Sequence, residues 1–221
     1  MKRFLVAPLI FFSFLSSAQN YSVQLAILHY SGGGDWYNDR TGMRNLANFC
    51  NQNFGMNINP DYATVEPSSV DLFNYPMIYM TGHGNFIFTD AEAGNVRDYL
   101  MSGGFLFLND DYGLDPFVRP AMKKVFPELD FVELPFSHPL FHQFYNFPNG
   151  VPKIHEHDGK PPQGFGLFYE GRMVAFYDFE SDIGDGLEDA NVHHDPAELH
   201  QKALQFAANL LKYVFQGEEP K

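Results

Sequence analysis

The chain has 221 residues, of which 45% are hydrophobic and 17% aromatic, a composition that fits a packed globular protein and excludes a disordered tail or a coiled coil. Its 27 acidic residues against 14 basic ones give a formal charge of −13, which opposes binding to the phosphate backbone of nucleic acids. The single cysteine allows neither an internal disulfide nor a cysteine-based zinc site.

The N-terminus has the pattern of a secretory signal peptide over residues 1–18. Lys2 and Arg3 precede an apolar run over 4–15, which is too short to span a bilayer, and small residues end at Ala18. No cysteine lies near that site, which disfavours a lipid anchor, and no later stretch is apolar enough for a membrane helix. We therefore expect a periplasmic or secreted mature chain; the alternative is a retained N-terminal anchor.

Apolar runs of strand length alternate with segments of helical periodicity. Strands are predicted at 23–30, 63–66, 77–80 and 105–108, each bounded by Gly, Asn or Asp. Helices are predicted at 43–54 and at 91–101, the second opened by a capping box of Thr89 and Glu92. A helical segment near 118–125 and a short strand near 131–134 follow. This alternation predicts crossover connections and a mostly parallel sheet.

The C-terminal third has a different pattern. Residues 146–163 form a proline-rich loop, which is either a lid or an insertion. Aromatic runs at 165–169 and 173–177 flank a turn signal at 170–172 and predict an antiparallel hairpin. Asp195 and Pro196 are typical of a helix start, and they open a final helix with one apolar face. We expect a single α/β domain over residues 19–221.

Polar side chains follow four of the predicted strands. Ligands of open α/β sheets bind beyond the carboxyl ends of the strands, so we expect these residues to share one cleft. For any one of them, capping of a helix or turn is the competing interpretation. The residues are Tyr30, Asp35, Trp36, His83, Asp110, Asp111 and Asp178.

Metal-ligating residue types are present without a complete metal motif. The string His155–Asp158 is one residue short of a metallo-hydrolase motif and lies in the proline-rich loop, so we interpret it as surface. The acidic segment 178–189 has Ile183 where an EF-hand needs glycine, which excludes an EF-hand but not a looser cation site. His193–Asp195 is interpreted as a solvated helix start. A divalent cation therefore stays open as a cofactor, with no ligands assigned.

Motifs for nucleophilic catalysis and phosphate binding are missing. The glycines at 32–34 lack the lysine of a Walker loop and the spacing of a dinucleotide fingerprint. Cys50 lies on the apolar face of a predicted helix, where burial removes thiol reactivity. No Gly-x-Ser-x-Gly elbow occurs. The sequence thus has no serine or cysteine hydrolase signature, and whether the chain is an enzyme stays open.

Five short motifs are spread over the mature chain: LHYSGGGDWY at 28–37, YPMIYMTGHG at 75–84, GGFLFLNDD at 103–111, SHPLF at 137–141 and DIGDG at 182–186. Together they resemble the domain-of-unknown-function family numbered 4159. The resemblance adds His138 and Asp182 to the candidate ligand-binding residues.

That family resembles the class I glutamine amidotransferase-like and trehalose-utilisation (ThuA-like) folds. The resemblance therefore implies a flavodoxin-like, mostly parallel sheet with helices on both faces, and it implies no activity. The corresponding loops here carry His83 or the pair Asp110 and Asp111 instead of a nucleophilic cysteine, so we expect no glutaminase activity.

Three functions fit these residues. The first is an exported binding or accessory module whose cleft holds a small polar ligand or a cation, with Tyr30 and Trp36 as stacking surfaces. The second is a hydrolase in which Asp110 or Asp111 acts as the base and His83 as an acid or ligand. The third is a structural partner in an envelope assembly, with the aromatic hairpin as its contact surface.

Overall fold

The computed structural model describes residues 21–216, which form one seven-stranded sheet with helices on both faces. The strand order is β2-β1-β3-β4-β7-β6-β5, and the first five of these strands are parallel. The strands are β1 (Val23–Leu28), β2 (Ile58–Val65), β3 (Met77–Met80), β4 (Phe105–Asn109), β5 (Val132–Glu133), β6 (Gln163–Tyr169) and β7 (Arg172–Phe179). The parallel part has the flavodoxin-like order, and β6 pairs antiparallel with β7, so the predicted fold is confirmed.

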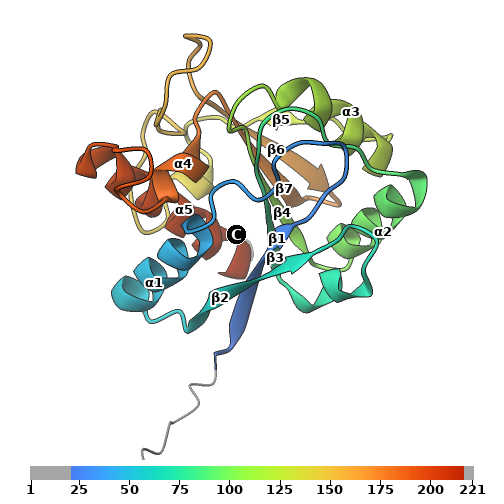
Figure 1. Cartoon of the computed structure of the whole chain (residues 1–221), viewed down its shortest axis with the longest axis horizontal. Coiled ribbons are helices and arrows are strands. Elements are labelled where there is room, and N and C mark those ends of the chain that lie inside the picture. The colour runs from blue at the N-terminus through green and yellow to red at the C-terminus, as the bar shows by residue number, and fades with distance from the viewer. Residues whose placement is uncertain (1–20, 217–221) are drawn as a thin grey trace, which may run out of the picture.

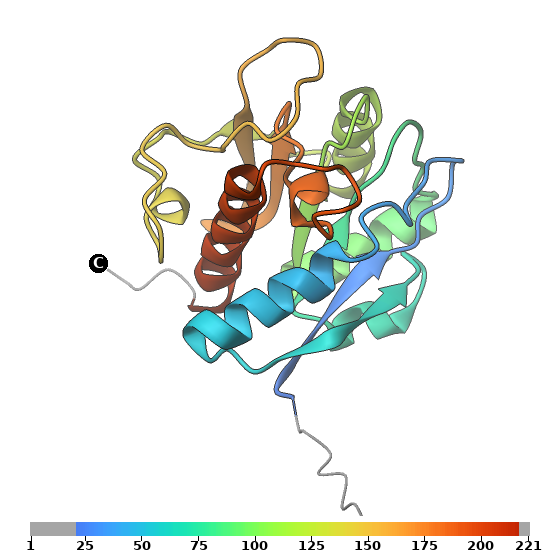
Figure 2. The ribbon, with the colours of Figure 1, turned by 60° about the vertical axis from the view of Figure 1, so that its left-hand side comes forward.

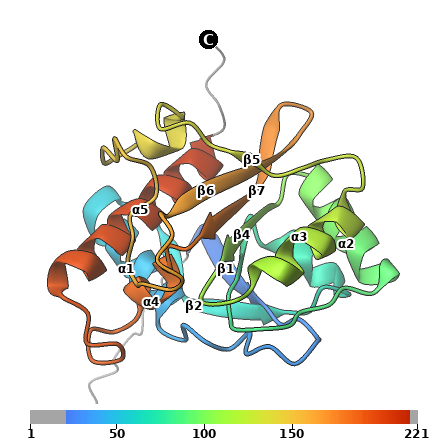
Figure 3. The same ribbon diagram turned by 90° about the horizontal axis from the view of Figure 1, so that it is seen from above.

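The helices form two layers, one on each face of the sheet (Figures 1 and 3). Helices α1, α4 and α5 cover one face, where Figure 2 shows α1 and α5 side by side. Helices α2 and α3 cover the other face. Their bounds are α1 (Gly42–Phe54), α2 (Asp90–Met101), α3 (Asp115–Val125), α4 (Ile183–Leu187) and α5 (Ala197–Gln216), with short 3-10 helices η1 (Val70–Asn74) and η2 (Pro139–Phe141).

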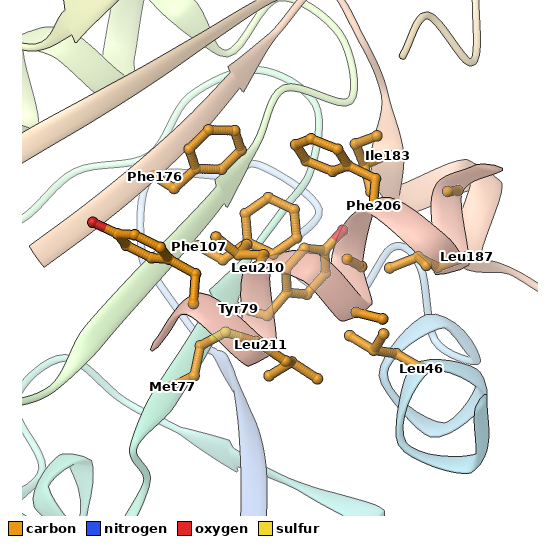
Figure 4. Close-up of a cluster of buried hydrophobic side chains, with 14 of the residues drawn as sticks. Leu46, Met77, Tyr79, Phe107, Phe176, Ile183, Leu187, Phe206, Leu210 and Leu211 are labelled. Carbon is orange, nitrogen blue, oxygen red and sulfur yellow. The ribbon is translucent and has the colours of Figure 1, made fainter. Parts of the chain in front are cut away.

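The central strands supply both hydrophobic cores because successive side chains of a strand point to opposite faces. Met77 and Tyr79 of β3 pack under α1 and α5, whereas Ile78 and Met80 pack under α2 and α3. Figure 4 shows the first core, in which Tyr79 lies among side chains from α1, α4 and α5. Burying one such side chain is worth about 1.5–3 kcal/mol, so these short strands are held firmly at the centre of the molecule.

Most predicted elements are confirmed, with shifted ends. The capping box of α2 is complete, with Thr89 and Glu92 each bonding the backbone of the other. Strand β2 begins five residues earlier than predicted, because it is an edge strand whose Asn59 and Asp61 disrupt the apolar pattern. Helix α4 was not predicted, since five residues with two glycines carry no helical signal.

A glycine allows α4 to pack against the ends of β3 and β4. A methyl group at Gly184 would overlap the Asp39 carboxylate, the Tyr79 hydroxyl and the Asn109 amide. The Gly184 backbone N–H instead donates to Asn109 Oδ1 at 2.7 Å. This close approach brings the acidic residues that flank Gly184 over the carboxyl edge of the sheet.

The predicted signal peptide, residues 1–18, lies outside the described residues. Among the helices that the structure does describe, none combines the length and the apolar character that crossing a membrane requires.

Candidate metal centre

A cluster of carboxylates and imidazoles lies at the carboxyl ends of β1, β3, β4 and β7. The chain reverses its direction of strand addition between β1 and β3, and ligands of doubly wound sheets bind at such a point. The cluster is built from Asp35 and Asp39 after β1, His83 after β3, Asp111 after β4, Asp182 and Asp185 after β7, and His155 from the proline-rich loop.

His83 joins two of the carboxylates. Its Nδ1 lies 3.1 Å from Asp35 Oδ2 and 2.9 Å from Asp111 Oδ2. The Asn38 side-chain amide also donates to Asp111 Oδ2. The Asp111 carboxylate is buried, whereas 51% of the His83 side chain is exposed, so this pair connects the buried part of the cluster with solvent.

Asp39 is a deeply buried acid of the cluster, and only 2% of it is exposed. Its Oδ2 accepts hydrogen bonds from the Tyr79 hydroxyl at 2.5 Å and from the Thr81 hydroxyl at 2.6 Å. Its Oδ1 is buried without a hydrogen-bond partner. One ligand oxygen from each of Asp39, Asp111 and Asp185 lies within 4.8 Å of the other two. Three carboxylates from separate segments thus meet at one place.

The proline-rich loop contributes His155 to the other side of the cluster. His155 Nδ1 lies 3.1 Å from Asp182 Oδ2 and 3.0 Å from Asp185 Oδ2, and its Nε2 lies 2.8 Å from Asp195 Oδ1. His157 Nε2 lies 3.4 Å from Asp182 Oδ2, and only 7% of its side chain is exposed. The interpretation of His155–Asp158 as surface is therefore wrong for both histidines.

The segment after α4 also reaches the cluster. His193 Nε2 lies 3.1 Å from Asp185 Oδ1 but without hydrogen-bond geometry, and that oxygen accepts no hydrogen bond. With Asp195 bound to His155, the interpretation of residues 193–195 as a merely solvated helix start is wrong. These contacts arise between segments that are distant in the chain, so no local sequence pattern predicts them.

Burial and mutual repulsion raise the pKa values of the central acids. Desolvation, and then the charges of Asp182 and Asp185, raise the pKa of Asp111 to about 8. The pKa of Asp39 is raised well above its usual value, first by burial and then by the charge of Asp111. Without a cation, the cluster is therefore expected to hold protons that free carboxylates would have lost at neutral pH.

On the His155 side of the cluster, the contacts favour the charged forms of both the imidazole and the carboxylate. Its bonds to Asp182 and Asp185 raise the pKa of His155 to about 11, against the effect of burial. Burial by itself would raise the pKa of Asp182, but the hydrogen bonds from His155 and His157 lower it. The His155 imidazolium thus supplies the positive charge beside Asp182, and a metal ion that binds there must displace its proton.

Several predicted site residues lie elsewhere or have structural partners. Asp110 Oδ1 accepts the Leu114 N–H, and Asp178 accepts the N–H groups of Asp110 and Ile183, so both hold the backbone beneath the cluster. Tyr30 is 3% exposed and its hydroxyl donates to the Thr81 carbonyl.

Two aromatic candidates lie outside the cluster. The Trp36 ring packs 4.2 Å from the His29 ring. His138 begins η2, where its Nδ1 accepts the Leu140 N–H, and its ring packs against Tyr213 of α5. Of the predicted site residues, the structure brings together Asp35, His83, Asp111 and Asp182.

A pocket of about 370 Å³ opens over the cluster. Its lining includes residues from both sides of the cluster: His83, Asp111, Tyr112, His155, Glu156, His157, Asp182 and Asp185. A ligand set that mixes imidazole and carboxylate groups is typical of Zn²⁺, Mn²⁺ or Fe²⁺ sites. Ca²⁺ and Mg²⁺ sites consist mainly of oxygen ligands. The arrangement can therefore hold a divalent cation beside a space of small-molecule size.

The fold and the cluster define an α/β protein with an acid–imidazole centre at the switch point of its sheet. The family model described as domain of unknown function (DUF4159) matches residues 24–215, and the chain belongs to this family. No curated protein matches it.

Replacing Asp111 by asparagine is expected to stabilise the metal-free protein at pH 8. The pKa of Asp111 is higher in the folded chain than in the unfolded one, so its ionisation destabilises the fold increasingly as pH rises from about 4 to about 8. The gain should reach about 1 kcal/mol or more, since one pKa unit corresponds to about 1.4 kcal/mol. Calorimetric melting in EDTA at pH 5 and pH 8 measures it.

At pH 5 the gain should be much smaller, because the penalty begins near the pKa of an aspartate in the unfolded chain, about 4, and grows with each further pH unit. The matched control is Asp98→Asn on the exposed face of α2, which should change little at either pH. An Asp111→Asn chain that melts below wild type at pH 8 would contradict the repulsion described above.

Proposed function

We propose that this chain binds a divalent cation between the ends of β1, β4 and β7. The observation that carries the proposal is the Asp39 carboxylate, which is 2% exposed and has an Oδ1 without a hydrogen-bond partner. A buried acceptor left unpaired costs roughly 1–3 kcal/mol, and more when it is charged. The neighbouring ligands come from Asp111 and Asp185, which are acids themselves, so a cation satisfies all three.

The donor set supports a transition metal rather than a purely oxygen-bound ion. His83 and His155 each place a ring nitrogen beside two carboxylates of the cluster. Ca²⁺ and Mg²⁺ prefer oxygen ligands, whereas Zn²⁺ and Mn²⁺ accept imidazole as well. A bound cation would face the pocket, where it could in turn hold a small polar ligand. This corresponds to the first of the three functions that the sequence suggests, a binding module with a cation or small polar ligand in its cleft.

Saturating Mn²⁺ or Zn²⁺ is expected to raise the melting temperature of the chain at pH 8 by about 5–10 °C. A ligand present at 100 times its Kd stabilises the folded state by about 2.7 kcal/mol, and 1 kcal/mol shifts the Tm of a domain this size by about 2–4 °C. The same titration of Asp39→Asn should give a much smaller shift. Asparagine retains an oxygen for Tyr79 and Thr81 but offers an amide in place of the free oxygen.

Asp98→Asn is again the matched control and should respond as wild type does. An unchanged Tm at saturating concentrations of both metals would contradict the proposal. So would an Asp39→Asn chain that responds as strongly as the wild-type chain.

A hydrolase is a second candidate, favoured by the 2.9 Å contact between His83 Nδ1 and Asp111 Oδ2. The pKa of Asp111, about 8, suits a base that operates near neutral pH. Asp111 would take a proton from a water molecule as the water oxygen bonds to the carbonyl carbon of an ester. The C–O bond to the leaving group then breaks, and His83 would give its proton to the leaving oxygen. This reaction needs no cation at His83.

Such a hydrolase should cleave p-nitrophenyl acetate in EDTA, and His83→Gln should lower the rate by about 10²–10⁴-fold, as is typical when a positioned acid or base is lost. Release of p-nitrophenol measures it, with His142→Gln on a remote exposed loop as the control. A wild-type rate equal to the rate in buffer would reject this candidate.

The structural-partner alternative gains no support from the hairpin. Phe176 and Tyr177 of β7 are fully buried, and Phe165 and Phe168 of β6 pack against the two cores. The β7 rings therefore stabilise the fold, and the β6 rings are only partly exposed.

We also propose that the chain is exported and related to the amidotransferase-like and ThuA-like folds. The basic, apolar and small residues of segment 1–18 support export, and the flavodoxin-like strand order supports the relation. Cys50 is no counterpart of an amidotransferase nucleophile, because burial in α1 raises its pKa to about 12. N-terminal sequencing of protein from the periplasm or the medium should begin at Gln19. Recovery only from cells, with Met1 retained, would contradict export.

A further inference from the structure

We propose that the centre holds two divalent cations, one beside His83 and one beside His155, with acidic side chains shared between them. The proposal rests on the proposed function, namely cation binding at this cluster, and adds the number of ions and the ligands of each.

The first ligand set is Asp35, His83 and Asp111. One ligand atom from each lies within 4.8 Å of the other two, with the His83 ring nitrogen between two carboxylate oxygens. Because Asp35 and His83 are partly exposed, an ion here would keep one side open to the solvent and the pocket.

The second ligand set is His155, Asp182 and Asp185. Its atoms satisfy the same distance criterion, and the two carboxylates are almost fully buried. Asp195 holds His155 through the other ring nitrogen, at 2.8 Å. Carboxylates bonded to the far nitrogen of a metal-binding histidine fix its orientation in many metal sites. This second set is therefore oriented by a residue outside it.

Asp39 connects the two sets. Its triad combines Asp111 from the first set with Asp185 from the second, and its own Oδ1 is buried without a hydrogen-bond partner. Asp39 thus lies where a carboxylate could bridge two ions. The unpartnered oxygen is an observation independent of the acidic character of the cluster, because Oδ2 of the same residue is fully satisfied by Tyr79 and Thr81.

A single ion does not account for both imidazoles. Two ligands of one Zn²⁺ ion lie at most about 4.4 Å apart, because each metal–ligand bond is about 2.0–2.2 Å long. Among the residues that the structure describes, each candidate triad contains at most one histidine. One ion would therefore bind one histidine and leave the other with its carboxylates.

The charge balance also favours two ions. The ligand sets contain five carboxylates, with a formal charge of −5 when all are ionised: Asp35, Asp39, Asp111, Asp182 and Asp185. One divalent ion beside His83, together with the His155 imidazolium, leaves two of these charges uncompensated, whereas two ions leave one. Uncompensated charge away from water is costly. Residues of both ligand sets line the same pocket, so a molecule in it would meet both ions.

The test is the binding stoichiometry of Mn²⁺, measured by calorimetric titration at pH 8 and by metal analysis after dialysis. The wild-type chain should bind two Mn²⁺ ions, and His83→Gln and His155→Gln should each bind one. The control His142→Gln should bind two, because His142 bonds to Asn146 and the Phe136 carbonyl in a remote loop. Electron paramagnetic resonance of the loaded wild type should show two exchange-coupled Mn²⁺ ions, and either single variant an uncoupled six-line signal.

Wild-type stoichiometry of one, with an uncoupled signal, would overturn the two-ion proposal and leave the proposed function standing. Stoichiometry of zero would overturn both. The resonance signal of the wild type decides between one ion and two even where a histidine variant fails to fold, since it needs no substitution.

Discussion

The repulsion among carboxylates buried at one edge of the sheet is the constraint on which the rest of this structure depends. Asp39, Asp111 and Asp185 come from three separate segments and meet out of water. Burial away from water, and then the charges of the neighbouring acids, raise the pKa values of Asp39 and Asp111. A fold that keeps such a cluster loses stability unless protons, imidazolium groups or metal ions compensate the charge.

The architecture supplies the rigidity that holds these acids together. Buried parallel strands end at a common edge, and apolar cores on both faces fix their positions. Gly184 lets α4 approach that edge closely enough for Asp182 and Asp185 to reach it. Asp39 and Asp182 also adopt left-handed backbone conformations, with φ of 53° and 61°, which are uncommon for residues other than glycine. Strained backbone of this kind gathers at functional sites, and here it coincides with the cluster.

The sequence predicts the sheet well because apolar runs and helix caps are local signals. It also predicts that Asp35, His83 and Asp111 belong to one edge, since each follows a strand. The sequence cannot show which of Asp110 and Asp111 faces the site. Adjacent side chains point in different directions, and the sequence does not reveal which direction each one takes. Only the folded chain shows that Asp110 accepts a backbone N–H while Asp111 meets His83.

The remaining ligands depend on contacts between distant segments. Asp39 lies eleven residues beyond the end of β1 and just outside the motif at 28–37. His155 lies in a proline-rich loop with no periodicity, and its partners Asp185 and Asp195 are 30 and 40 residues further along the chain. Asp185 belongs to the motif DIGDG at 182–186. Its three-residue spacing from Asp182 is the local sequence signal that indicates it as a second ligand.

Anomalous diffraction from crystals grown with Mn²⁺ decides whether these acids bind a metal ion, because it locates the ion among individual side chains. We expect anomalous density among the carboxylates of Asp39, Asp111 and Asp185, at about 2.0–2.4 Å from their oxygens. Crystals soaked to saturation that show no anomalous density in this cluster, or density only at surface acids, would contradict it.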